Sequence, residues 1–432
     1  MPPDRTFPVL TVLVFLPALG GIVVTIAGRM RAALVPWLAV LFAGMTLVLA
    51  VWVLGGVQGG GFSEFAAWVP SLGVSFILAS DELSSLLVVW VALATWVTLI
   101  ATLPSWRSAV WVLGLETAAN GLFLAQDVFL VFAFLGGVAV AVALLSTAPR
   151  KVLVFAVLGL SVLFSWFVRF YQMAYAQTGF PSTELARWRS LVLYPDDERS
   201  LFLLGACGIA LFVPAFAIAV ENAPRAHRLA LFATIGVIGS YLVIRLLVPL
   251  CPGGADASSG WVLAFAALLM ASAGLARGFS LVAVGYHGLV LFGLFSFRES
   301  AVVGAEVMMI AVAIGFFGLE LATSRRLVTY FVLFLIGTSI AFVLVPVWGG
   351  GTLWASLGTL TFSMMAYRFV TLAKTSPAGD VENVGRRRIL SAAVVVLSVS
   401  MIVGWGAWAA RVRPSAIDFV HSVAAAMKTA EP

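Results

Sequence analysis

The amino-acid sequence predicts an all-α polytopic membrane protein with about 13–14 transmembrane helices. Hydrophobic residues make up 62% of the 432-residue chain and charged residues only 10%, whereas soluble domains are about 45–50% apolar and about 25% charged. Apolar runs of the length that a spanning helix needs, about 20 residues, follow one another almost without interruption. The short alternating strands typical of an outer-membrane barrel are missing from the pattern. The composition thus excludes a soluble enzyme, a nucleic-acid-binding protein and a disordered chain.

The predicted spans follow these apolar runs in order. They cover residues 7–27, 33–55, 82–104, 108–126, 128–148, 152–176, 200–220, 229–250, 261–276, 279–297, 300–322, 327–347, 352–373 and 389–410. Two connections are longer than the rest. Residues 177–199 are expected to hold a short surface helix that ends at the acidic run 196–198, and residues 374–388 form the other long loop. Neither is long enough for a globular domain, so we expect no cofactor on this chain.

The basic residues predict the topology. Loops after odd-numbered spans contain fourteen Lys and Arg residues, and loops after even-numbered spans contain four. Because cytoplasmic loops carry the basic excess, we expect the odd loops inside and both termini outside. The formal net charge of +6 then marks topology, not a nucleic-acid partner.

The sequence offers little for metal or disulfide chemistry. Its two cysteines, Cys207 and Cys251, lie in or beside apolar runs, which argues against a disulfide framework. The three histidines, His227, His287 and His421, are too far apart for a paired metal motif. We therefore expect no metal site.

Ionisable residues inside the predicted spans are few, and each costs at least about 2.5–3.5 kcal/mol on insertion scales, so each needs a reason. The candidates are Glu116, Arg245, His287, Glu306 and Glu320. Arg245 is expected to extend to the interface, His287 to be a hydrogen-bonded packing residue, and the two glutamates of span 300–322 to lie at its solvated ends. An alternative gives all five a place in a proton path.

Glu116 allows two interpretations. It is either a proton carrier or a hydrogen-bonded packing residue beside Thr117 and Asn120. Asp127, by contrast, lies at the start of a span, where a carboxylate favours the helix N-terminus. The three lysines all lie in loops or the tail, so no lysine is available at mid-membrane.

Several segments resemble, in family order, antiporter-like subunit M (chain 4 type) of NADH-quinone oxidoreductase, respiratory complex I. They are WVPSLGVSFILASDELSSLL (68–87), LETAANGLFLAQDVFLVFAF (115–134), the Val213-Pro214 pair, the Tyr241 and Arg245 pair, ARGFSLVAVGYHGLVLFGLFSF (276–297) and PSAIDFVHSVAAAM (414–427). The resemblance implies an antiporter-like inverted-repeat bundle. Its N-terminal helices would cover 1–126, its first repeat 127–260 and its second repeat 261–373. A cytoplasmic loop, last helix and tail would cover 374–432.

The departures from the family pattern are systematic. The family's buried glutamate in the fifth span is Gly136 here, and its mid-membrane lysine is Val237. The lysine before Arg277 is Ala276, and a histidine in the following helix is Val312. The resemblance therefore identifies a degenerate member, in which the polar groups of the proton path are lost.

The resemblance implies a membrane-arm subunit of a complex I-like, proton-translocating NADH:quinone oxidoreductase in the bacterial inner membrane. This subunit would be structural and non-catalytic, its partners being other membrane-arm subunits and the lipid bilayer. Two alternatives stay open. The chain either still translocates protons through substitute residues (Glu116, His287, Glu306 and Glu320, joined by water and Tyr286), or it is a stand-alone cation/proton antiporter-like transporter.

Overall fold

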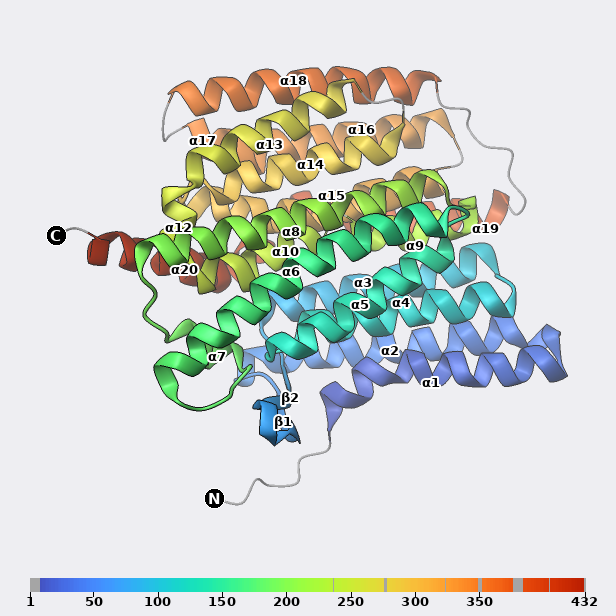
Figure 1. Cartoon of the computed structure of the whole chain (residues 1–432). Coiled ribbons are helices and arrows are strands. Elements are labelled where there is room, and N and C mark those ends of the chain that lie inside the picture. The colour runs from blue at the N-terminus through green and yellow to red at the C-terminus, as the bar shows by residue number, and fades with distance from the viewer. Residues whose placement is uncertain are drawn as a thin grey trace. The chain divides into compact units, whose positions relative to one another are not determined.

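The computed structural model describes residues 8–430, apart from 236, 276–277, 323, 349–351, 376–383 and 404. The described chain is helical almost throughout (Figure 1). The helices are α1 (Val9–Met30), η1 (Ala32–Leu34), α2 (Val35–Gly56), η2 (Val57–Gly59), η3 (Pro70–Leu72), α3 (Glu82–Thr102), α4 (Trp106–Leu124), α5 (Val128–Leu145), α6 (Pro149–Thr178), α7 (Leu185–Arg189), α8 (Pro195–Glu221), α9 (Arg225–Ile235), α10 (Ile238–Leu242), η4 (Val243–Leu247), α11 (Val248–Leu250), α12 (Pro252–Ala257), α13 (Ser259–Gly274), α14 (Phe279–Leu294), α15 (Glu299–Leu321), α16 (Arg325–Ser339), η5 (Ile340–Leu344), α17 (Val345–Trp348), α18 (Thr352–Thr375), α19 (Val384–Val403) and α20 (Trp405–Ala430).

The predicted all-helical, multi-pass class is confirmed. Among the described residues, nine helices are long and apolar enough to cross a membrane, and α13 and α14 are shorter apolar helices. Each predicted span coincides with a helical segment, except that residues 389–410 are divided between α19 and α20. The predicted orientation of the termini stays a prediction.

Two local features differ from the sequence prediction. Residues 63–79 form an antiparallel hairpin of β1 (Ser63–Val69) and β2 (Val74–Ala79), which the hydropathy pattern did not indicate. The surface helix α7 exists, but the acidic run 196–198 begins α8 instead of ending α7. Pro195 and three acidic residues suit a helix start, because proline needs no hydrogen-bond acceptor there and carboxylates favour the N-terminal end of the helix dipole.

The chain forms two compact units. The first contains residues 1–145 and 167–191, and the second contains residues 146–166 and 192–432. In the first unit, α4 packs against α1, α3 and α5, while α2 packs against α1 and α3. The boundaries of the two expected repeats are a separate matter and stay a prediction.

The second unit is built around α15. Every residue of this helix from Ala301 to Gly318 is buried, because α9, α14, α16, α19 and α20 all pack against it. The helices α13, α14 and α18 are neighbours in the same unit (Figure 1). Two π-helical turns, η4 and η5, interrupt helices of this unit; such turns occur frequently at functional sites.

Candidate functional site

Glu116 lies midway along α4 and is fully buried. Neither of its carboxylate oxygens has a hydrogen-bond partner among the described residues, and the same holds for the amide of Asn120, one turn further along. The hydroxyl of Thr117 donates instead to the carbonyl oxygen of Leu113, at 3.0 Å. The described residues thus supply no hydrogen bond for the packing interpretation of Glu116, and both interpretations stay predictions. A buried ionisable group without a fixed partner is the kind of residue that marks a functional position in a membrane.

Small or apolar residues lie at the positions where the resemblance predicts lost polar groups. Gly136 lies in α5, and a β-carbon added there would meet no described atom within 4 Å. Val237 is fully buried where α10 begins, and Val312 is buried in α15. The third position, Ala276, lies outside the described residues. Packing around Gly136 therefore leaves room for the first atom of a side chain, so its absence is not a steric requirement of this chain.

His287 lies in α14 and is 5% exposed. Its Nδ1 is 3.1 Å from the Oγ of Ser240, which lies in α10. The contact supplies the hydrogen bond that the packing interpretation expects, and the choice between packing and proton transfer stays a prediction. The neighbouring Tyr286 is also buried, and its ring lies edge-on against Phe316 at a centroid distance of 5.6 Å. Arg245 lies in η4, half-buried between fully buried neighbours.

The two glutamates of α15 have different environments. Glu306 is fully buried and accepts a hydrogen bond of 3.1 Å from the hydroxyl of Ser415 in α20. Glu320 lies near the end of the helix and forms an ion pair of 3.2 Å with Arg228, whose side chain is 33% exposed. The expectation of solvated ends is thus wrong for Glu306, because α20 covers this part of α15.

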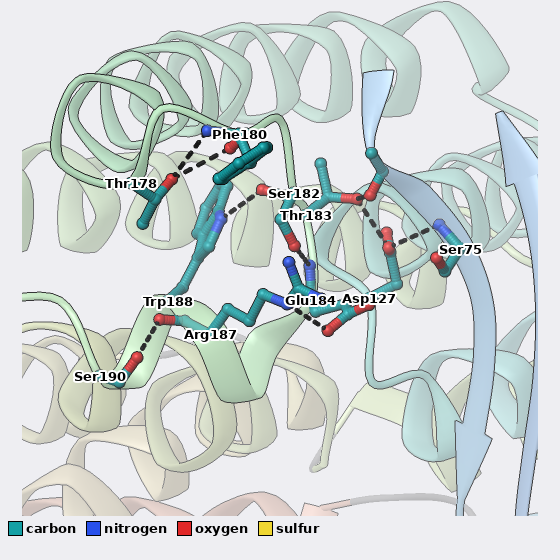
Figure 2. A network of polar contacts seen from close by, with 11 residues as sticks. Ser75, Asp127, Thr178, Phe180, Ser182, Thr183, Glu184, Arg187, Trp188 and Ser190 are labelled. Carbon is teal, nitrogen blue, oxygen red and sulfur yellow. Dashed lines mark hydrogen bonds and ion pairs between the residues drawn. The ribbon is translucent and has the colours of Figure 1, made fainter. Parts of the chain in front are cut away.

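Asp127 is the centre of a buried polar network that the sequence only partly indicated (Figure 2). Its Oδ1 accepts hydrogen bonds from the backbone N–H of Phe129 and Leu130, at 2.9 and 3.2 Å, at the start of α5. Its Oδ2 accepts from the backbone N–H of Ser75 in β2 at 3.1 Å, and from the hydroxyl of Thr183 at 2.6 Å. The predicted place at a helix N-terminus is confirmed, and the carboxylate also joins the hairpin to the segment before α7.

The pKa of Asp127 is raised by burial. The hydrogen bonds from Thr183, Ser75, Leu130 and Phe129 lower it, but by less than burial raises it. The surrounding segment is held independently, because the indole Nε1 of Trp188 donates to the carbonyl oxygen of Ser182 at 2.7 Å (Figure 2). Asp127 therefore holds β2, the start of α5 and the segment before α7 together.

The predicted proton-path residues do not form one cluster among the described residues. They lie at separate contacts between helices. Glu116 belongs to the first compact unit, and the other four belong to the second. Within the second unit, His287 contacts α10, Glu306 contacts α20 and Glu320 contacts the start of α9. These groups can hold charge or exchange protons locally.

Solved structures with this fold are membrane complexes. The chain superposes on a chain of respiratory complex I from Thermus thermophilus with a TM-score of 0.83 and 18% identity, covering 96% of this chain and 99% of that one. It superposes on a chain of the archaeal membrane-bound sulfane sulfur reductase with a TM-score of 0.80, 17% identity and coverage of 96% and 99%. For the Mrp complex of Dietzia sp. the TM-score is 0.73, with 16% identity and coverage of 96% and 52%. The chain is thus a multi-pass membrane protein with the antiporter-like fold.

Curated relatives define the homology more closely. NADH-quinone oxidoreductase subunit M of Pseudomonas aeruginosa is 26% identical over 355 residues, which cover 69% of this chain and 68% of that protein. Subunit M of Escherichia coli is 32% identical over 143 residues, 28% of this chain and 27% of that protein. NAD(P)H-quinone oxidoreductase chain 4 3 of Picosynechococcus sp. is 32% identical over 144 residues, 31% and 25% of the two chains.

The matched region thus spans about a quarter of the Escherichia coli and Picosynechococcus relatives and about two thirds of the Pseudomonas one. No protein-family model matches the chain. These alignments confirm the predicted resemblance: the chain is a homologue of the proteins named NADH-quinone oxidoreductase subunit M and chain 4.

Proposed function

We propose that the chain is a membrane-arm subunit of a complex I-like, proton-translocating assembly in a bacterial inner membrane, and that its own proton channel is lost. The homology to subunit M proteins supports the first part. The observation that carries the second is the occupation of the family's ionisable positions by Gly136 and Val237, the latter fully buried. A proton relay needs ionisable groups at mid-membrane, and neither residue titrates. The chain then has no catalytic residue of its own and acts by connecting neighbouring subunits.

A second function, in which substitutes carry protons, is favoured by one observation. The buried carboxyl group of Glu116 has no hydrogen-bond partner among the described residues. In this alternative, Glu116, His287, Glu306 and Glu320 exchange protons through water, with Tyr286 beside them. The two functions predict different effects on proton translocation when these ionisable residues are replaced by neutral ones.

Proton-to-electron stoichiometry separates these functions. We expect Glu116→Gln and His287→Gln to leave the ratio of protons moved to electrons transferred unchanged when the purified complex is reconstituted in liposomes. Glutamine is close in size to glutamate and cannot release a proton, so the exchange removes the chemistry while keeping most of the packing. An uncoupler provides the control that the assay reports proton movement. A reproducible fall in the ratio for either variant would contradict the loss of the channel.

Purification tests the assembly itself. We expect a tagged chain extracted in mild detergent to bring down other antiporter-like membrane subunits together with redox subunits. A chain that purifies alone, and that supports cation/proton exchange in liposomes, would instead identify a stand-alone transporter. The same preparation analysed in harsh detergent, where subunit contacts dissociate, is the matched control.

A further inference from the structure

A cavity of about 290 Å³ lies within the second unit, between α8, the α10–η4 segment, α13 and α14. Its walls are apolar side chains and glycine, with two polar exceptions, Ser240 and His287. These two are hydrogen-bonded to each other and are 2% and 5% exposed. The cavity therefore has one small polar group pair in an otherwise apolar lining.

The opposite part of the lining is exposed. Trp261 is 72% exposed, Leu203 44% and Phe265 40%, and Cys207 is exposed as well. Leu203 and Cys207 lie in α8, which is long and apolar enough to cross a membrane. These exposed side chains give the chain an apolar surface beside the cavity. The cavity therefore opens at an apolar surface of the chain, with its polar pair at the buried end.

The wall formed by α10 and η4 has an unusual backbone. A β-carbon at Gly239 would lie 2.7 Å from Cγ2 of Val213 and 3.7 Å from Cε1 of His287, so a larger residue here would require the Val213 side chain to shift. The π-helical turn η4 follows directly and contributes Val243 and Leu247 to the wall. A glycine and a π-helical turn thus both contribute to the wall of the cavity.

The apolar lining and its single polar pair determine which class of ligand the cavity can bind. A cavity lined by apolar side chains stays dry and accepts apolar molecules, and a ligand charge buried there without a partner would cost too much free energy. A single hydroxyl or carbonyl group, however, can exchange a hydrogen bond with the serine hydroxyl or the imidazole. We propose that this cavity binds a neutral lipophilic molecule that enters from the bilayer and hydrogen-bonds with the Ser240–His287 pair through one hydroxyl or carbonyl group. This inference does not depend on the proposed function.

Ligand binding in the cavity can be followed through the reactivity of Cys207. It lines the cavity and is exposed, whereas Cys251 is fully buried. Burial raises the pKa of the Cys251 thiol, and the nearby Glu198 carboxylate raises it further. Protein encloses Cys251 but not Cys207, so monobromobimane should reach and label Cys207 and leave Cys251 unmodified.

The experiment measures the rate of bimane labelling in lipid nanodiscs, with 1-dodecanol as the probe and dodecane as its apolar counterpart. We expect 1-dodecanol to slow labelling of Cys207 by roughly fivefold or more, at lower concentration than dodecane. Ser240→Ala should raise the concentration of 1-dodecanol for half-protection by about 3–10-fold, the range expected for one lost hydrogen bond, and leave dodecane unaffected. Ala210→Phe, which fills the cavity, should abolish protection by both.

The control is a lipid-facing thiol outside the cavity. Leu268 lies in α13, is 64% exposed and is not part of the lining. In Leu268→Cys combined with Cys207→Ala, 1-dodecanol should not slow labelling. Equal slowing at both thiols, or no slowing at Cys207, would overturn the cavity as a binding site. Equal potency of 1-dodecanol and dodecane at Cys207 would overturn the role of the polar pair.

Discussion

Replacing Gly304 by alanine is expected to lower the free energy of unfolding by about 3 kcal/mol, the upper part of the usual range for overpacking. Gly304 lies in the fully buried part of α15. A β-carbon at this position would overlap the backbone carbonyl oxygen of Phe342 in η5. A backbone group cannot rotate away as a flexible side chain can, so α15 and η5 would have to separate. Unfolding of the purified chain in mixed detergent micelles, followed by circular dichroism, measures the loss.

Gly337 provides the matched control. It lies in α16, another helix of the same unit, and an added β-carbon there would meet no described atom within 4 Å. Because alanine favours helix over glycine by about 0.5–1 kcal/mol, Gly337→Ala should be neutral or slightly stabilising. Equal losses for both variants would show that the close approach to Phe342 is not what makes Gly304 necessary.

The hydropathy of the sequence predicted where the helices lie but not where they are interrupted. Continuous apolar runs determine spans, because a bilayer requires about 20 of these residues in succession. The turns η4 and η5 lie inside such runs, in VIRLL and IAFVL, where nothing in the hydropathy changes. The hairpin was missed for another reason. A two-stranded sheet is marginal by itself, and this one is held by distant contacts such as the bridge between Leu78 and Ala125.

The environment of a candidate residue could be predicted where it depends on neighbouring residues in the sequence. Asp81 precedes α3 and accepts a hydrogen bond from the backbone N–H of Ser84 at 2.8 Å, as a carboxylate before a helix suggests. The burial of Glu306 was not predictable, because the helix that covers it lies about a hundred residues later and contributes Ser415. Glu116 was correctly singled out as an unusual residue, but its lack of a described partner required the packing of neighbouring helices. Ser240 was not singled out, since serine in an apolar run carries no signal until its neighbour His287 is known.

Asp127→Ala is expected to destabilise the chain by about 3–5 kcal/mol, because each buried donor left without an acceptor costs about 1–3 kcal/mol. The variant removes the acceptor of four hydrogen bonds at once, from Ser75, Thr183, Phe129 and Leu130. These bonds join β2, the start of α5 and the segment before α7 (Figure 2). Detergent-induced unfolding measures the total loss. Hydrogen exchange should become faster first at the backbone amides of Ser75, Phe129 and Leu130.

Two comparisons make this prediction specific. Asp127→Asn keeps one carbonyl oxygen as an acceptor, so it should retain part of the stability that Asp127→Ala loses. Glu184→Ala removes the ion pair with Arg187 in the same segment, where the two side chains are 23% and 60% exposed, and exposed pairs contribute only about 0–1 kcal/mol. If Glu184→Ala destabilised the chain as much as Asp127→Ala, the segment as a whole would be fragile and the buried carboxylate would not be its centre. A loss concentrated at Asp127 means that one acidic residue at a span boundary organises three separate segments of the chain.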